Sequence, residues 1–270
     1  MQTIRTRAGQ TLAFSAYGTP RNPPLLLLHG FCEDSSVWAT LIPLLEEQYV
    51  LVADLPGFGA SERSADATLE AWADAIAELL ETLSLPPVVC CGHSLGGYVG
   101  LALAERHPHL LAGLSLFHSH PYPDSPERIE GRRRAIELLQ QGKKDLYVAQ
   151  LFPNLFAPAF ASAYPDIVEG LIANGRQQSA EGIIDALKAM MQRPDRHAVL
   201  ENLQIPLQML LGKQDNLIPL EDGLRSALKA ARVEVKVWPE AGHMGMYENT
   251  TQSAAALANF VTDCILFQAQ

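Results

Sequence analysis

The sequence predicts an α/β fold in which a mostly parallel sheet is flanked by helices. Short, continuous apolar runs such as "PLLLLHG" (24–30) and "VVCCG" (88–92) are typical of strands buried on both faces. Amphipathic stretches separate these runs, and in 68–85 the apolar residues recur with a 3.6-residue period. Strands that alternate with helices in this way form a parallel sheet with helices on both faces.

The elements can be assigned in order along the chain. The alternating stretches "TIRTRAG" and "TLAFSAYG", joined near Gly9 and Gln10, predict an opening antiparallel hairpin. The first block continues with strand 24–30, helix 36–47, strand 49–57, helix 68–85, strand 88–92, helix 94–107 and strand 110–119. A second block comprises strand 205–212, helix 219–231, strand 233–239 and a closing helix 248–267.

The alternation stops between Ser119 and Ile205, directly after the sixth strand. This segment has helical patterns of its own and is too long for an ordinary connection, so we expect an insertion that packs on the sheet. The sequence therefore predicts a core of residues 1–119 and 205–270 and a helical cap, or lid, of residues 120–204.

Composition bounds the partners and the compartment. A formal net charge of -10 over 270 residues argues against nucleic acid or an anionic membrane as a partner. The first residues, "MQTIRTRAGQTLAF", lack the apolar core of a signal peptide, and the run Leu25–Leu28 is too short to span a bilayer. The four cysteines form no CxxC pair and no zinc spacing. We expect reduced thiols in a cytoplasmic protein that is a monomer or a homodimer.

A serine at the joint between a buried strand and a helix is the first candidate catalytic residue. Ser94 lies in a G-x-S-x-G motif, Gly92-His93-Ser94-Leu95-Gly96. Such a motif places the serine on a sharp, strained turn with its Oγ exposed above the sheet. The flanking glycines fit because side chains would collide across so tight a turn. Serine is also a common helix N-cap, which is the structural alternative.

A base and an orienting acid follow two later strands. His243 lies in "WPEAGHMGMYEN" after the last predicted strand, and Asp215 lies in "LLGKQDNLIP" after the strand before it. Parallel strands share a carboxyl edge, so we expect both side chains beside Ser94, in the chain order of a nucleophile triad. Alone, His243 could be a surface histidine and Asp215 a turn residue. Asp54, at the end of an earlier strand, is an alternative orienter.

Acyl transfer also requires N–H donors for a tetrahedral oxyanion. The Leu95 amide, at the start of the helix after Ser94, is one candidate. The Phe31 amide, in the loop after strand 24–30, is the other.

Taken together, these motifs resemble the α/β-hydrolase family over nearly the whole chain. They are "HGF" (29–31), "DLPGFGAS" (54–61), "GHSLGG" (92–97), the acid of "GKQD" and the histidine of "EAGHMGMYEN", in the family's order. The resemblance implies a carboxylesterase-like serine enzyme that needs no cofactor. It also assigns the Phe31 and Leu95 amides to an oxyanion hole and Asp54 to the "PGFG" turn. Members that cleave epoxides or carbon–halogen bonds carry aspartate where this chain has Ser94.

Other residues bear on the pocket and on metal binding. Trp38, His120 and Tyr122 are candidate pocket residues, with core packing as the alternative. His118 and His120 are two apart, with Cys32 expected nearby, but a further ligand is missing and we expect no metal. The basic stretch "RIEGRRR" (128–134) is either a solvated helix face or a means of attracting an anionic substrate.

The sequence thus predicts a serine hydrolase that cleaves a carboxylic ester or related acyl compound, a small molecule, through an acyl-enzyme. One alternative keeps the scaffold but hydrolyses a carbon–carbon bond, or acts as a lyase of the menaquinone-pathway type. An arginine such as Arg132 or Arg176 pointing into the cavity would favour it. A second alternative is a receptor-like module that binds a ligand and turns over slowly or not at all.

Overall fold

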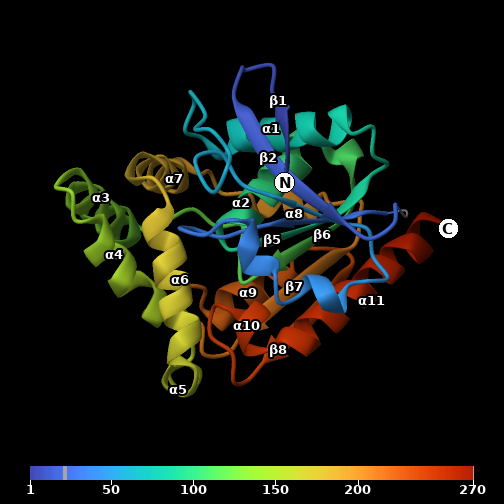
Figure 1. Ribbon diagram of the computed structural model, residues 1–270. Helices are drawn as coiled ribbons and strands as arrows, with labels where there is room; N and C mark the ends of the chain where they lie inside the picture. Colours follow the sequence, from blue (N-terminus) through green and yellow to red (C-terminus); the bar gives the residue numbers. More distant parts are fainter. Residues whose placement is uncertain (21–22, 270) are drawn as a thin grey trace.

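The computed structural model describes residues 1–20 and 23–269, which form an eight-stranded sheet (Figure 1). The strands lie in the order β1-β2-β4-β3-β5-β6-β7-β8. The β1–β2 hairpin and the β2–β4 pair are antiparallel, and the remaining pairs are parallel, which confirms the predicted sheet. The strands are β1 (Gln2–Arg5), β2 (Thr11–Tyr17), β3 (Leu25–Leu28), β4 (Val50–Ala53), β5 (Val88–His93), β6 (Leu111–Phe117), β7 (Leu207–Gly212) and β8 (Val233–Trp238).

Helices cover both faces of this sheet. In β6, Gly113 lies against Cys264 of α11, whereas its neighbour Leu114 lies against Gly100 of α2. Successive strand residues point to opposite faces, so α2 and α11 lie on opposite sides of the sheet (Figure 1). The core helices are α1 (Leu69–Thr82), α2 (Leu95–Arg106), α9 (Leu220–Ala227), α10 (Gly245–Glu248) and α11 (Thr250–Gln268).

The segment between β6 and β7 is helical, as its sequence pattern predicts. Figure 1 shows α3 to α6, in yellow-green and yellow, gathered to one side of the sheet. The elements are α3 (Pro126–Gln140), α4 (Lys144–Leu151), the 3₁₀ helix η4 (Phe152–Leu155), α5 (Pro158–Ala163), α6 (Pro165–Gln177), α7 (Ala180–Gln192) and α8 (His197–Glu201). The division into a core of 1–119 and 205–270 and a cap of 120–204 remains our proposal.

Three predicted helices differ from those observed. The helix expected at 36–47 is two short 3₁₀ helices, η1 (Ser35–Trp38) and η2 (Ile42–Leu44). Pro43 explains the break, because it has no N–H to donate within an α-helix. The helix expected at 219–231 ends at Ala227, and the closing helix begins at Thr250 after the separate turn α10.

All four cysteines are free and buried, as expected of reduced thiols. Among the described residues, none of the helices has the length and apolar character needed to cross a bilayer.

Candidate active site

Ser94 lies between β5 and α2 in a strained backbone conformation, with φ 49° and ψ -110°. The neighbouring glycines make this turn possible. A Cβ on Gly92 would lie 2.2 Å from the Gly96 carbonyl oxygen, and one on Gly96 would lie 2.3 Å from the Leu28 carbonyl oxygen. The Ser94 side chain makes no capping hydrogen bond, so its hydroxyl does not serve as the helix N-cap. The strain instead holds the serine at the carboxyl edge of the sheet.

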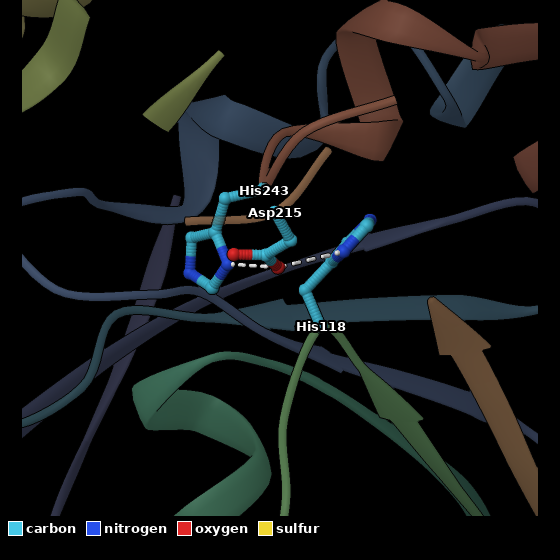
Figure 2. A group of neighbouring side chains, drawn as sticks. All are labelled: His118, Asp215 and His243. Atoms are coloured by element: carbon cyan, nitrogen blue, oxygen red, sulfur yellow. Dashed lines mark hydrogen bonds and ion pairs between the residues drawn. The ribbon is translucent and has the colours of Figure 1, made fainter. Parts of the chain in front are cut away.

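Asp215 and His243 meet at the same edge. The His243 Nδ1 lies 2.7 Å from the Asp215 Oδ2, and both side chains are almost fully buried (Figure 2). The other carboxylate oxygen, Oδ1, accepts the Leu217 and Ile218 amides at 2.8 and 2.9 Å. Two backbone amides therefore hold the carboxylate through one oxygen while the other contacts the imidazole.

The electrostatics of Asp215 keep it ionised. Burial by itself would raise the pKa of this carboxyl group, but the charge of His243 and the hydrogen bonds from His118 and His243 outweigh that effect. The net result is a pKa far below the ordinary range of an aspartate. A permanent negative charge next to the His243 ring favours the imidazolium that forms when the ring accepts a proton.

Asp54, the alternative orienter, is engaged elsewhere. Its Oδ1 accepts the Ser35 amide at 2.8 Å and its Oδ2 accepts the Ala60 amide at 2.9 Å. The Ala60 bond closes the loop after β4, which is the role that the motif "DLPGFGAS" implies, and the Ser35 bond ties that loop to the start of η1. Asp215 is the carboxylate that contacts His243.

The backbone of His243 is fixed by residues that the sequence did not single out. Its N–H donates to the Leu155 carbonyl at 2.7 Å, and its carbonyl is 2.9 Å from the His93 Nε2. The Glu248 carboxylate accepts the amides on either side, those of Gly242 and Met244. Leu155 and His93 are distant from His243 in sequence, so no local pattern could have predicted their contacts. Glu248 lies only five residues after His243 and could have been found from its nearby position in the sequence.

Ser94 and His243 border the same small cavity of about 20 Å³, together with Phe31 and Leu217. A larger cavity of about 370 Å³ opens beside it and is also lined by Ser94 and Phe31. The structure therefore brings Ser94 and His243 together at one void, and places a space for a small molecule next to the hydroxyl.

The two candidate oxyanion donors both adjoin Ser94, Phe31 at the cavities and Leu95 as the next residue along the chain. Phe31 lines both cavities, and the preceding amide, that of Gly30, already donates to Glu33. Leu95 is the first residue of α2, where an N–H has no acceptor within its own helix. The contact of Gly96 with the Leu28 carbonyl brings this helix start against the end of β3. The assignment of both amides stays a prediction.

The candidate pocket residues Trp38, His120 and Tyr122, all within the described ranges, are not among the residues that line these two cavities. Trp38 is fully buried and stacks on Phe117, with ring centroids 5.9 Å apart. The His120 ring contacts the Tyr122 ring and makes an edge contact with the Tyr98 ring, with centroids 5.7 Å apart in both pairs. The larger cavity is instead lined by side chains that include Tyr98, Arg128, Arg132, Tyr147 and Met190.

A sequence model described as alpha/beta hydrolase fold matches residues 23–250, which is most of the chain. The chain belongs to the α/β-hydrolase family. A thermophilic esterase from Thermogutta terrifontis, solved with malate bound, superposes with a TM-score of 0.91 and 31% identity, covering 98% of this chain and 99% of the esterase.

Curated α/β-hydrolase relatives span different reactions. A 2-hydroxymuconate semialdehyde hydrolase from Pseudomonas sp. (strain CF600) is 26% identical, over 89% of this chain and 87% of its own. A 2-succinyl-6-hydroxy-2,4-cyclohexadiene-1-carboxylate synthase from Enterobacter sp. (strain 638) is 29% identical, over 90% and 93%. This α/β-hydrolase is thus an enzyme of the hydrolase class, whose specific reaction has to be argued from its site.

Proposed function

We propose that this α/β-hydrolase is a serine hydrolase that cleaves a carboxylic ester or related acyl compound through an acyl-enzyme. The observation that carries the proposal is the arrangement of His243. Its Nδ1 is hydrogen-bonded to the buried Asp215 carboxylate, while its ring borders the same small void as Ser94. A nucleophile, a base and an orienting acid are the groups that acyl transfer requires.

The reaction proceeds in two halves. The Ser94 Oγ attacks the carbonyl carbon as the His243 Nε2 takes the hydroxyl proton, and the Phe31 and Leu95 amides stabilise the oxyanion. The tetrahedral intermediate collapses, the carbon–oxygen bond to the alcohol breaks, and His243 returns the proton to that alcohol. A water then attacks the acyl-enzyme as His243 accepts one of its protons; the bond from the acyl carbon to the Ser94 Oγ breaks, His243 returns the proton to that Oγ, and the carboxylic acid leaves.

A screen of p-nitrophenyl esters of increasing acyl length, with the Ser94→Ala variant as control, tests this proposal. We expect steady turnover that falls by at least about 10³-fold in Ser94→Ala, because the nucleophile is lost while the fold remains. Circular dichroism and the thermal midpoint check that the variant is folded. Wild-type activity in folded Ser94→Ala would disprove the proposal, and a single stoichiometric burst without turnover would favour the receptor-like alternative.

A second candidate function, hydrolysis of a carbon–carbon bond or a lyase reaction, is supported by the cap arginines. Arg128 and Arg132 line the larger cavity beside Ser94, whereas Arg176 is exposed outside it. Such cations suit a substrate with a carboxylate near the reacting carbon. The names of the two curated relatives above and the malate in the related esterase agree with an anionic ligand. Turnover of a vinylogous 1,5-diketone that exceeds turnover of every ester would favour this candidate.

A further inference from the structure

His118 is a buried imidazole that the mechanism above does not use. It directly follows β6, its side chain is fully buried, and its backbone has a φ of 50°. A non-glycine residue adopts such a conformation at a cost of about 1 kcal/mol or more. Its N–H donates to the Leu210 carbonyl of β7 at 2.9 Å, which holds the backbone in place. The ring is therefore fixed at the carboxyl edge of the sheet, where the candidate catalytic residues lie.

The Asp215 carboxylate has two imidazole partners. The Nδ1 atoms of His243 and His118 lie 2.7 and 3.2 Å from the same oxygen, Oδ2 (Figure 2). Figure 2 shows the two rings directed at this carboxylate from two sides. The other oxygen, Oδ1, is occupied by the Leu217 and Ile218 amides. His118 thus competes with His243 for the negative charge of one oxygen atom.

The protonation state of His118 follows from its surroundings. Burial lowers the pKa of this ring to about 4, although Asp215 acts in the opposite direction, so the ring is uncharged at neutral pH. Its one proton must lie on Nδ1, which faces the carboxylate. In the part of the chain that the structure describes, Nε2 has no partner. His118 is therefore a neutral donor and adds no positive charge of its own.

His118 is also separated from the substrate. His118 is not one of the described residues that line the two cavities at Ser94. Its ring packs on Phe117, with centroids 5.0 Å apart, and beside Trp238 at 6.2 Å. Its ring centroid also lies 5.7 Å from that of His243, and its hydrogen bond to the candidate site is the one to the Asp215 carboxylate.

A metal ion is not needed to explain this cluster. His118, Asp215 and His243 offer ligand atoms within 4.8 Å of one another. However, the Nδ1 atoms of both rings already face Oδ2 at hydrogen-bond distances. Hydrogen bonds account for the geometry of all three side chains.

We infer that His118 is a positioning residue whose Nδ1–H holds the Asp215 carboxylate and limits the negative charge that this carboxylate presents to His243. The inference rests on the proposed function, because it assigns His243 as the base. A second donor on Oδ2 stabilises the carboxylate and thereby weakens its pull on the imidazolium form of His243. The result is a base that releases its proton more readily to the leaving group and to solvent.

Two substitutions separate this role from packing. In His118→Asn the amide nitrogen replaces Nδ1 as a donor, and asparagine tolerates a positive φ. In His118→Phe the ring volume remains but the donor is lost. The other ionisable groups around the two histidines are Glu33, His93, Asp215 and Glu248, and they are the same in both variants.

A ¹⁵N NMR titration of the His243 ring in the wild type and both variants tests this role of His118. The pH profile of kcat/KM on a p-nitrophenyl ester is measured for the same three proteins. We expect His118→Phe to move the His243 midpoint and the acid limb upward by about one pH unit, the equivalent of one ordinary hydrogen bond. We also expect kcat to fall about tenfold with KM unchanged, and His118→Asn to restore the wild-type values.

The His243 midpoint tests the role of His118, whereas the activity of Ser94→Ala tests the proposed function, so the two can fail independently. An unchanged His243 midpoint in His118→Phe, or equal shifts in both variants, would overturn the role of His118, whatever the activity. If the midpoint moves as expected while Ser94→Ala remains fully active, the inference about His118 stands and the proposed nucleophile is wrong.

Discussion

At the residue scale, a buried ion pair between Glu33 and His93 contacts the backbone on two sides of the candidate site. The His93 Nδ1 lies 3.1 Å from the Glu33 Oε2, and both side chains are 1% exposed. Glu33 also accepts the Gly30 amide, next to the candidate oxyanion donor, while the His93 Nε2 lies 2.9 Å from the His243 carbonyl. One pair therefore connects the loop after β3 to the loop that carries the base.

The pH dependence of this pair follows from its two pKa shifts. For Glu33, burial acts to raise the pKa, but His93 outweighs it, so the pKa falls below 4.5. For His93, burial acts to lower the pKa, but Glu33 outweighs it, so the pKa rises above 6.5. The stability due to Glu33 is present above its ordinary pKa and is lost on acidification. The stability due to His93 is complete below 6.5 and is lost as the pH rises through its folded value.

We therefore expect Glu33→Gln to lower the free energy of unfolding most between pH 4.5 and 6.5. The loss should be about 3 kcal/mol at pH 5.5, because a buried charge loses its partner, and smaller at pH 8.5. Urea unfolding at the two pH values measures this difference. An equal loss at both would show that the pair is not charged in the folded protein.

At the element scale, the joint between β5 and α2 depends on close backbone contacts. The start of α2 lies so near the end of β3 that a Cβ on Gly96 would be 2.3 Å from the Leu28 carbonyl oxygen and 2.7 Å from that of His29. This approach brings the Leu95 amide and the Phe31 loop to the same edge. Glycine is required at position 96 because a side chain would collide with this backbone, and not because of its φ, which is outside the left-handed region.

We expect Gly96→Ala to destabilise the protein by about 2 kcal/mol or more, since the added methyl group must push α2 away from rigid backbone. We also expect kcat to fall, because the Leu95 amide moves. The matched control is Gly170→Ala in α6, where a Cβ would meet no atom within 4 Å and where alanine should stabilise by about 1 kcal/mol. Thermal unfolding and ester turnover test both, and a harmless Gly96→Ala would contradict the packing argument.

At the scale of the whole molecule, the larger cavity lies where α3, α4 and α7 meet the sheet edge. Its cap side carries excess positive charge. The Asp124 carboxylate is shared by Arg132 and Arg193, at 2.6 and 2.7 Å. Arg128 donates to the Leu217 carbonyl and has no carboxylate partner among the described residues. In a chain with a net charge of -10, this local surplus favours an anionic group in the cavity.

We expect Arg128→Met to raise KM for the anionic hemiester mono-p-nitrophenyl adipate about tenfold, because a charge-assisted hydrogen bond is lost. Hydrolysis of p-nitrophenyl hexanoate, which has the same acyl length without the charge, should be unaffected. Arg134→Met is the control, since Arg134 lies on the same helix with its side chain 73% exposed and paired with Glu130. Equal effects on the two esters would argue against an anion site.

The fold class could be predicted correctly from local patterns in the sequence, and the same patterns name three candidate residues for the site. Strand and helix periodicities are local, and the topology of parallel strands places the loops after β5, β7 and β8 at one edge. Ser94, Asp215 and His243 could therefore be named from their positions after these strands. The α-helix predicted at 36–47 is wrong, because the segment contains Pro43 and forms two short 3₁₀ helices instead.

The side chains that surround these three residues could not be predicted from the sequence, because they come from elements that are far apart along the chain. The residue types of Trp38, His120 and Tyr122 suit a pocket, yet the packing of α2 and α3 brings Tyr98, Arg128 and Arg132 to the cavity instead. The pairs Glu33–His93 and His118–Asp215 join residues 60 and 97 positions apart. Such contacts depend on how whole elements pack, because a shift of a few ångströms exchanges one side chain for another without changing the periodicity of either element.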